Sequence, residues 1–207
     1  MATSLTETVA ANGDDGWTDI VEMMGNSDNF TQAYMIVGHA GDGATTRNLF
    51  ARFDAVDLEA GFTIASAKLQ FILNANNSDS FPTKIRVDLN SNADPAAYSD
   101  GDAQVAASLT TDGNSVVWTV SSGTAGATVD SPDVTALVNS LLALGNWDTG
   151  QAMIFQVTYE DDDSTTQEIR FSTNEHGSHS PAKLIVTYTE VIKAGGIPQT
   201  LMLDELF

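Results

Sequence analysis

The clearest candidate for chemistry in this sequence is DLNSNAD, residues 88–94, where side chains that carry oxygen recur at every second position. The four residues in question are Asp88, Asn90, Asn92 and Asp94. Calcium prefers carboxylate and amide oxygens, and this spacing is typical of the start of a calcium-binding loop. Ala93 replaces the glycine, and Ser99 the glutamate, that an EF-hand requires. We therefore predict a calcium site outside the EF-hand class, with a solvated loop as the alternative.

Three histidines, His39, His176 and His179, are the other side chains that could take part in catalysis. A metal-dependent hydrolase holds such residues on a rigid scaffold and leaves one coordination position open. His176 and His179 instead fall in NEHGSHS, which has the composition of a hairpin loop, next to Glu175. The sequence contains no cysteine and no G-x-S-x-G motif. We predict no catalytic residue and a protein that is not an enzyme.

The segment IPQTLMLDELF, residues 197–207, has the composition of a binding segment. It follows two glycines and carries six large apolar side chains, those of Ile197, Leu201, Met202, Leu203, Leu206 and Phe207. Exposed apolar side chains in such numbers mark an interaction site. The segment could dock as a short amphipathic helix or add a strand to the sheet edge of a neighbour. We predict that it binds another subunit or a scaffold protein, with docking onto its own domain as the alternative.

The charge of the chain excludes one class of partner. Its 207 residues include 28 acidic and 8 basic ones, which gives a formal net charge of −20. Nucleic-acid binding needs cationic side chains that displace counterions from phosphates, so we predict no nucleic-acid partner. The first residues, MATSLTETVA, lack the basic start and apolar run of a signal peptide, and no stretch approaches the roughly 20 apolar residues of a membrane span. We expect no contact with a membrane.

Short runs of alternating apolar and polar residues dominate the remaining sequence and are separated by Gly, Asn, Asp and Ser. They occupy residues 33–41, 48–56, 65–74, 83–90, 115–121, 152–160, 168–173 and 182–190, with 17–24 as a further candidate. Period-two alternation rich in β-branched and aromatic residues predicts strands. The pattern predicts an all-β fold, an antiparallel jelly-roll-like β-sandwich of about eight strands.

One segment has helical rather than strand periodicity. SPDVTALVNSLLALGNW, residues 131–147, begins with Ser131 as a potential N-cap and Pro132 at the first helical position. Apolar residues then recur at helical spacing up to Gly145. We predict one amphipathic helix packed on a sheet. The domain organisation that follows is an N-terminal arm or edge strand (1–16), the sandwich (17–192), and a linker with a docking tail (193–207).

Three segments, taken together and in this order, resemble the DNRLRE-type β-sandwich domains. The first, within residues 49–73, carries a strand ending in R-F-D, a glycine turn and I-x-S-A-x-L-x-F, formed by Arg52, Phe53, Asp54, Gly61, Ile64, Ser66, Ala67, Leu69 and Phe71. Residues 131–158 are similar to the family's helix and W-x-x-G corner, and residues 168–190 to its closing hairpin, although Pro181 precedes Ala182 instead of following it. The resemblance implies a jelly roll, with Arg52 and Asp54 in an ion pair or turn hydrogen bond.

Such domains occur on cell surfaces, beside polysaccharide-active enzymes and among virus structural proteins, and some related modules bind acidic polysaccharides. We therefore predict a structural virion protein of a tailed virus, a capsid decoration or tail-associated protein assembled in the host cytoplasm. Its partners would be further copies of the chain or a major capsid or tail protein. The alternative is a carbohydrate-binding or adhesive module, calcium-dependent or not, that holds surface glycans on exposed aromatic residues such as Trp17, Tyr34, Tyr98 or Trp118.

Overall fold

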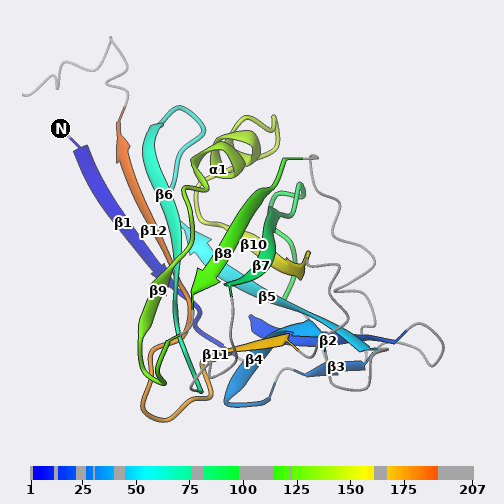
Figure 1. The fold of residues 1–207 in the computed structure, drawn as a ribbon. Helices are drawn as coiled ribbons and strands as arrows, with labels where there is room; N and C mark the ends of the chain where they lie inside the picture. The colour runs from blue at the N-terminus through cyan, green and yellow to red at the C-terminus, as the bar shows by residue number, and fades with distance from the viewer. Residues whose placement is uncertain are drawn as a thin grey trace, which may run out of the picture.

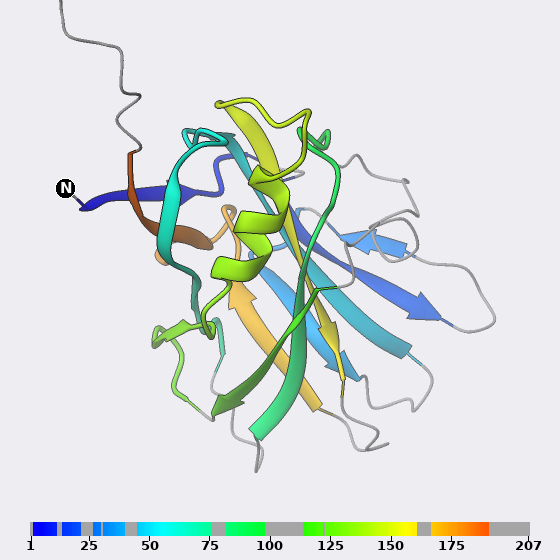
Figure 2. The same cartoon turned by 90° about the horizontal axis from the view of Figure 1, so that it is seen from above.

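The computed structural model describes residues 2–11, 14–21, 27–29, 31–39, 45–75, 82–97, 114–121, 123–160 and 167–190. Its strands form two antiparallel sheets with one short helix, as Figures 1 and 2 show. The prediction of an all-β sandwich is confirmed. The described residues form twelve strands rather than about eight. The further candidate at 17–24 is a strand, and three more strands, two of only three residues and one at the N-terminus, lack a clear alternating pattern.

The smaller sheet contains four strands in the order β1-β12-β6-β9. Their bounds are β1 Ala2–Thr8, β12 Lys183–Thr189, β6 Thr63–Ile72 and β9 Thr128–Asp130. β1 lies at the edge and pairs with β12 over its whole length, from Ala2 opposite Thr189 to Thr8 opposite Lys183. Of the two alternatives for the first residues, the structure therefore has the edge strand.

The larger sheet has the order β11-β4-β5-β10-β7-β8, and β2 and β3 pair off this path. Its strands are β2 Asp15–Val21, β3 Ser27–Asn29, β4 Tyr34–His39, β5 Thr45–Val56, β7 Pro82–Leu89, β8 Val116–Ser121, β10 Gln151–Tyr159 and β11 Gln167–Ser172. β2 pairs with both β5 and β3. Figure 1 shows this sheet extending from beneath the helix to the β2–β3 hairpin.

The core lies between the sheets and follows from the alternation of the sequence. In β12, Leu184, Val186 and Tyr188 are buried, whereas the residues between them are partly exposed. Both sheets contribute aromatic rings: Phe71 of β6 lies 4.8 Å from Phe171 of β11 and 5.9 Å from Trp118 of β8, centroid to centroid. Burying rings of this size supplies much of the hydrophobic stabilisation of a domain.

The helix α1 spans Thr135–Leu142 and is shorter than the predicted 131–147. Ser131 does not cap it, because its Oγ accepts a hydrogen bond from the Leu69 N–H of β6 at 2.9 Å. Asp133 instead accepts the N–H of Thr135 at 2.8 Å. The predicted apolar face is buried as expected, through Leu137, Val138, Leu141 and Leu142. In the part of the chain that is described, no helix has the length and apolar character needed to cross a bilayer.

Candidate functional site

The residues predicted to bind calcium lie at the end of β7 and in the loop that follows. Asp88 is buried and accepts a hydrogen bond from Arg86 Nε at 2.9 Å. The Asn90 Oδ1 accepts the N–H of Asn92 at 2.9 Å, which closes a local turn. Asp94, with a φ of 54°, accepts the N–H of Ala152 at 3.1 Å. Asp88, Asn90 and Asp94 therefore each have a protein partner, and calcium at these four residues stays a prediction.

The two loop histidines, His176 and His179, stack on each other with ring centroids 4.1 Å apart. The Nδ1 of His176 accepts the N–H of His179 at 2.9 Å, and the Nδ1 of His179 lies 2.9 Å from Ser172 Oγ. Burial, and secondly the nearby His179, lower the pKa of His176, so its imidazole is neutral at pH 7. The Nδ1 of His176 thus stabilises the loop itself, and the Nδ1 of His179 joins the loop to the end of β11, as is usual for polar side chains of this kind.

The predicted binding residues Ile197, Leu201, Met202, Leu203, Leu206 and Phe207 lie outside the described residues, as does Tyr98. Two of the other aromatic candidates belong to the core: Trp17 is 7% and Trp118 5% exposed. A ring at an alternating position of a strand points to one face or the other, and here both tryptophans face inward. Tyr34 is half-buried, with the guanidinium of Arg170 5.2 Å from its ring centroid. Trp17 and Trp118 therefore offer no surface to a sugar ring.

A hollow of about 360 Å³ lies between the β5–β6 turn and the corner that follows α1. Its wall includes Phe62, Trp147 and the acidic residues Glu59 and Asp148. Trp147 is 4% exposed, and its Nε1 donates to the Leu58 carbonyl at 2.8 Å. This ring therefore joins the segment after α1 to the turn between β5 and β6. Phe62 stacks on Tyr188 at 4.7 Å. The aromatic rings at this hollow are thus engaged in packing.

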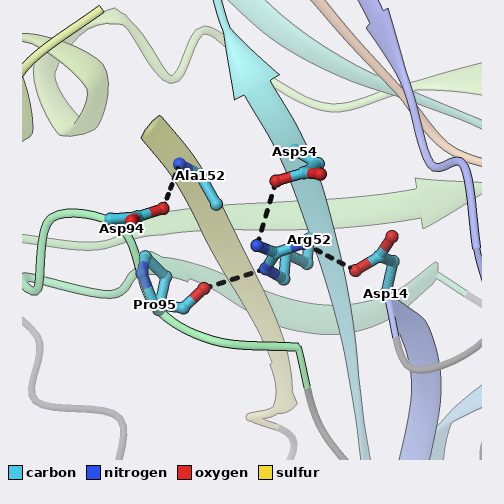
Figure 3. A network of polar contacts seen from close by, with 6 residues as sticks. All are labelled: Asp14, Arg52, Asp54, Asp94, Pro95 and Ala152. Carbon is cyan, nitrogen blue, oxygen red and sulfur yellow. Dashed lines mark hydrogen bonds and ion pairs between the residues drawn. The ribbon is translucent and has the colours of Figure 1, made fainter. Parts of the chain in front are cut away.

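A network of polar contacts centres on Arg52 of β5 (Figure 3). Its guanidinium donates from Nη1 to Asp14 Oδ1 at 2.8 Å, from Nη2 to Asp54 Oδ1 at 3.0 Å and from Nε to the Pro95 carbonyl at 2.8 Å. Arg52 is 8% and Asp14 4% exposed. Of the two alternatives for Arg52 and Asp54, an ion pair or a turn hydrogen bond, the structure has the ion pair. Arg52 also joins the segment before β2 and the loop after β7 to β5.

Next to this network lies the carboxylate of Asp15, which, unlike that of Asp14, forms no ion pair with Arg52. Asp15, the first residue of β2, is fully buried, and its Oδ2 accepts the N–H of Asn174 at 2.9 Å. Its Oδ1 has no hydrogen-bond partner, and neither does either buried carboxylate oxygen of Glu175. Burial raises the pKa of Asp15 to about 7; the Asn174 N–H opposes this, and the charges of Glu175 and Asp14 add to it. An unpaired buried carboxylate is costly and calls for an explanation.

Asp14 and Asp15 were not predicted from the sequence, and Glu175 was considered only as a neighbour of His176. Their neighbours in the sequence give no motif, and the contact between Asp15 and Asn174 joins residues 159 positions apart. The only local signal was the pair of aspartates that precedes Trp17, in a chain with 28 acidic residues. The network consists of carboxylates, one guanidinium and backbone groups, and such an arrangement clamps segments together rather than activating a nucleophile.

No protein-family model and no curated protein matches this sequence significantly. The resemblance to DNRLRE-type domains therefore stays a prediction.

Proposed function

We propose that the protein is a non-enzymatic structural subunit of a larger assembly, held by its apolar segment 197–207. In its most concrete form it is a virion protein of a tailed virus, either a capsid decoration or a tail-associated protein. The observation that carries the proposal is the position of the end of β12, the last strand before this segment in the sequence. Ala2 pairs with Thr189, so the start of β1 and the end of β12 share one corner of the smaller sheet. Figures 1 and 2 show the N-terminus beside the end of β12.

A segment that follows β12 would transmit any pulling force to β12, and the place of β12 in the sheet makes this strand resistant to being pulled out. β12 is an interior strand, flanked by β1 on one side and β6 on the other. Its register includes seven residue pairs with each of these neighbours. A force along β12 loads the hydrogen bonds on both sides in shear, so they resist together instead of breaking one by one. The sandwich is therefore well suited to be held by one end while the rest of the molecule projects outward.

Composition supports the same division of roles. The net charge of −20 favours solubility of a projecting domain and opposes unspecific contact between copies. The binding energy would instead come from the apolar segment, whose side chains contribute roughly 1.5–3 kcal/mol each when buried, before ordering costs. A few such anchors dominate the binding energy of most interfaces.

Light scattering on the full chain and on a chain that ends at Gly195 tests this proposal. We expect a defined oligomer for the full chain and a monomer for the shortened one, because the shortened chain lacks all six apolar anchors. Replacing Leu203 and Phe207 by serine should give the same loss, and replacing Gln199 and Thr200 by serine should leave the mass unchanged. If the full chain is a monomer, or if the shortened chain keeps the oligomer, docking of this segment between copies is refuted.

A further inference from the structure

Three buried carboxylate oxygens, Asp15 Oδ1 and both oxygens of Glu175, lack a hydrogen-bond partner. They come from opposite ends of the chain: Asp15 opens β2, and Glu175 lies in the loop between β11 and β12. The hydrogen bond from the Asn174 N–H to Asp15 Oδ2 holds the two segments together at 2.9 Å. Asp15 is 0% exposed, so water has little access to its free oxygen.

The loop that carries Glu175 is fixed on its other side as well. Thr173 is 1% exposed, and its hydroxyl donates to the Gln32 carbonyl. Its N–H donates to the Ala33 carbonyl at 3.4 Å. Glu175 therefore belongs to a segment with defined contacts to both β2 and the chain before β4. Its carboxylate lies near enough to Asp15 for its negative charge to raise the pKa of Asp15.

The nearby basic side chains have other partners. Arg52 pairs with Asp14 and Asp54, at 2.8 and 3.0 Å. The imidazole of His176 is neutral at pH 7, and its Nδ1 accepts backbone N–H groups of its own loop. Among the described residues, no basic side chain forms an ion pair with Asp15 or Glu175. The negative charge of this pair is thus left without an internal counter-ion in the described part of the chain.

A shared proton, a buried water molecule and a bound cation can each satisfy such a pair, but a water molecule leaves the negative charge uncompensated. One proton between the carboxyl groups would serve Asp15 Oδ1 and one oxygen of Glu175, and it would leave the second Glu175 oxygen unpartnered. A cation between them can take all three oxygens as ligands. Carboxylate oxygens select hard cations, and calcium accepts the irregular geometry that a site built from two loops offers.

We propose that Asp15 and Glu175 bind one calcium ion, which fastens the start of β2 to the loop between β11 and β12. No group of three His, Cys, Asp or Glu side chains suited to a metal occurs in the described ranges, so the remaining ligands would be backbone carbonyls and water. A site with two carboxylates is expected to bind weakly, in the range of about 10⁻⁴–10⁻³ M that is typical of extracellular calcium modules. The inference does not depend on the proposed function.

Calorimetry of the full chain, stripped with EDTA and then titrated with calcium chloride, tests this site. At a hundredfold excess of calcium over Kd, the Tm is expected to rise by about 5–10 °C, because calcium binds only the folded state. Asp15→Asn and Glu175→Gln should each abolish the rise. In EDTA, Asp15→Asn should melt at or above the wild-type Tm, since the variant keeps the oxygen for Asn174 and loses the buried charge. Neither variant should change the oligomeric mass.

Asp94→Asn is the matched control, because asparagine also accepts the Ala152 N–H and tolerates the positive φ of this position. This variant should keep the full response to calcium. The inference is overturned if calcium leaves the wild-type Tm unchanged, or if magnesium chloride raises it equally. It is also overturned if Asp15→Asn keeps the response while Asp94→Asn loses it, which would move the site to residues 88–94.

Discussion

Replacing Arg52 by methionine is expected to lower the free energy of unfolding by about 3–5 kcal/mol, the usual cost of breaking a buried ion pair. Methionine preserves the unbranched stem but removes the guanidinium. Asp14, which is 4% exposed, would then be left buried without its cation, and the Pro95 carbonyl would lose its donor. Urea unfolding followed by tryptophan fluorescence measures the loss.

Two variants show whether the buried pair causes this loss. Asp14→Asn combined with Arg52→Met should recover much of the stability, because the orphaned charge is gone. Lys68→Met breaks an exposed pair instead, in which Lys68 Nζ lies 2.6 Å from Asp130 Oδ2 and both side chains are 41% exposed. It should cost less than about 1 kcal/mol. Equal losses in the free energy of unfolding for Arg52→Met and Lys68→Met would contradict a stabilising role of the buried pair between Arg52 and Asp14.

Asp15→Asn is expected to change how stability depends on pH when EDTA keeps the protein free of metal. The pKa of Asp15 rises from 3.8 in the unfolded chain to about 7 in the folded one. The folded state therefore binds more protons between these values, so the contribution of Asp15 to stability is full below pH 3.8 and is lost as pH rises through about 7. The difference is about three pKa units at about 1.4 kcal/mol each, or up to about 4 kcal/mol.

The difference between wild type and Asp15→Asn isolates this contribution from all other titrating groups. Their free energies of unfolding are expected to diverge in favour of the variant as pH rises from about 4 to about 8. Glu175→Gln should reduce the divergence, because the Glu175 charge is one cause of the raised pKa. A difference that stays constant across this range would show that Asp15 ionises normally in the folded protein.

Most of the strands could be predicted from the sequence because their alternation is strong and local. β5, β6, β7, β10 and β12 all fall within or around the expected runs. β3 and β9 have three residues each, too few for a periodic signal. The N-terminal part of the expected helix was wrong because Ser131 is used by β6, which is a tertiary contact that capping rules do not include.

The polar network was only partly predictable. Arg52 and Asp54 sit two residues apart on one strand, so their pairing follows from the alternation of side chains. Asp14 pairs with Arg52, 38 positions away, and Asp15 with Asn174, 159 positions away, and nothing in their local sequence separates these two aspartates from the other acidic residues. The burial of Trp118 could not be predicted either, because alternation along a strand does not reveal which of its two faces is covered by the other sheet.

Hydrogen exchange of residues 197–207, followed by mass spectrometry over a range of protein concentrations, tests most directly whether this segment holds the assembly together. Burial between copies is expected to slow exchange of its amides at least about tenfold relative to free peptide, and dilution should remove that protection. Exchange at the free-peptide rate at every concentration would contradict docking between copies. Protection that does not change on dilution would contradict it as well, because the segment would then be folded back onto its own sandwich.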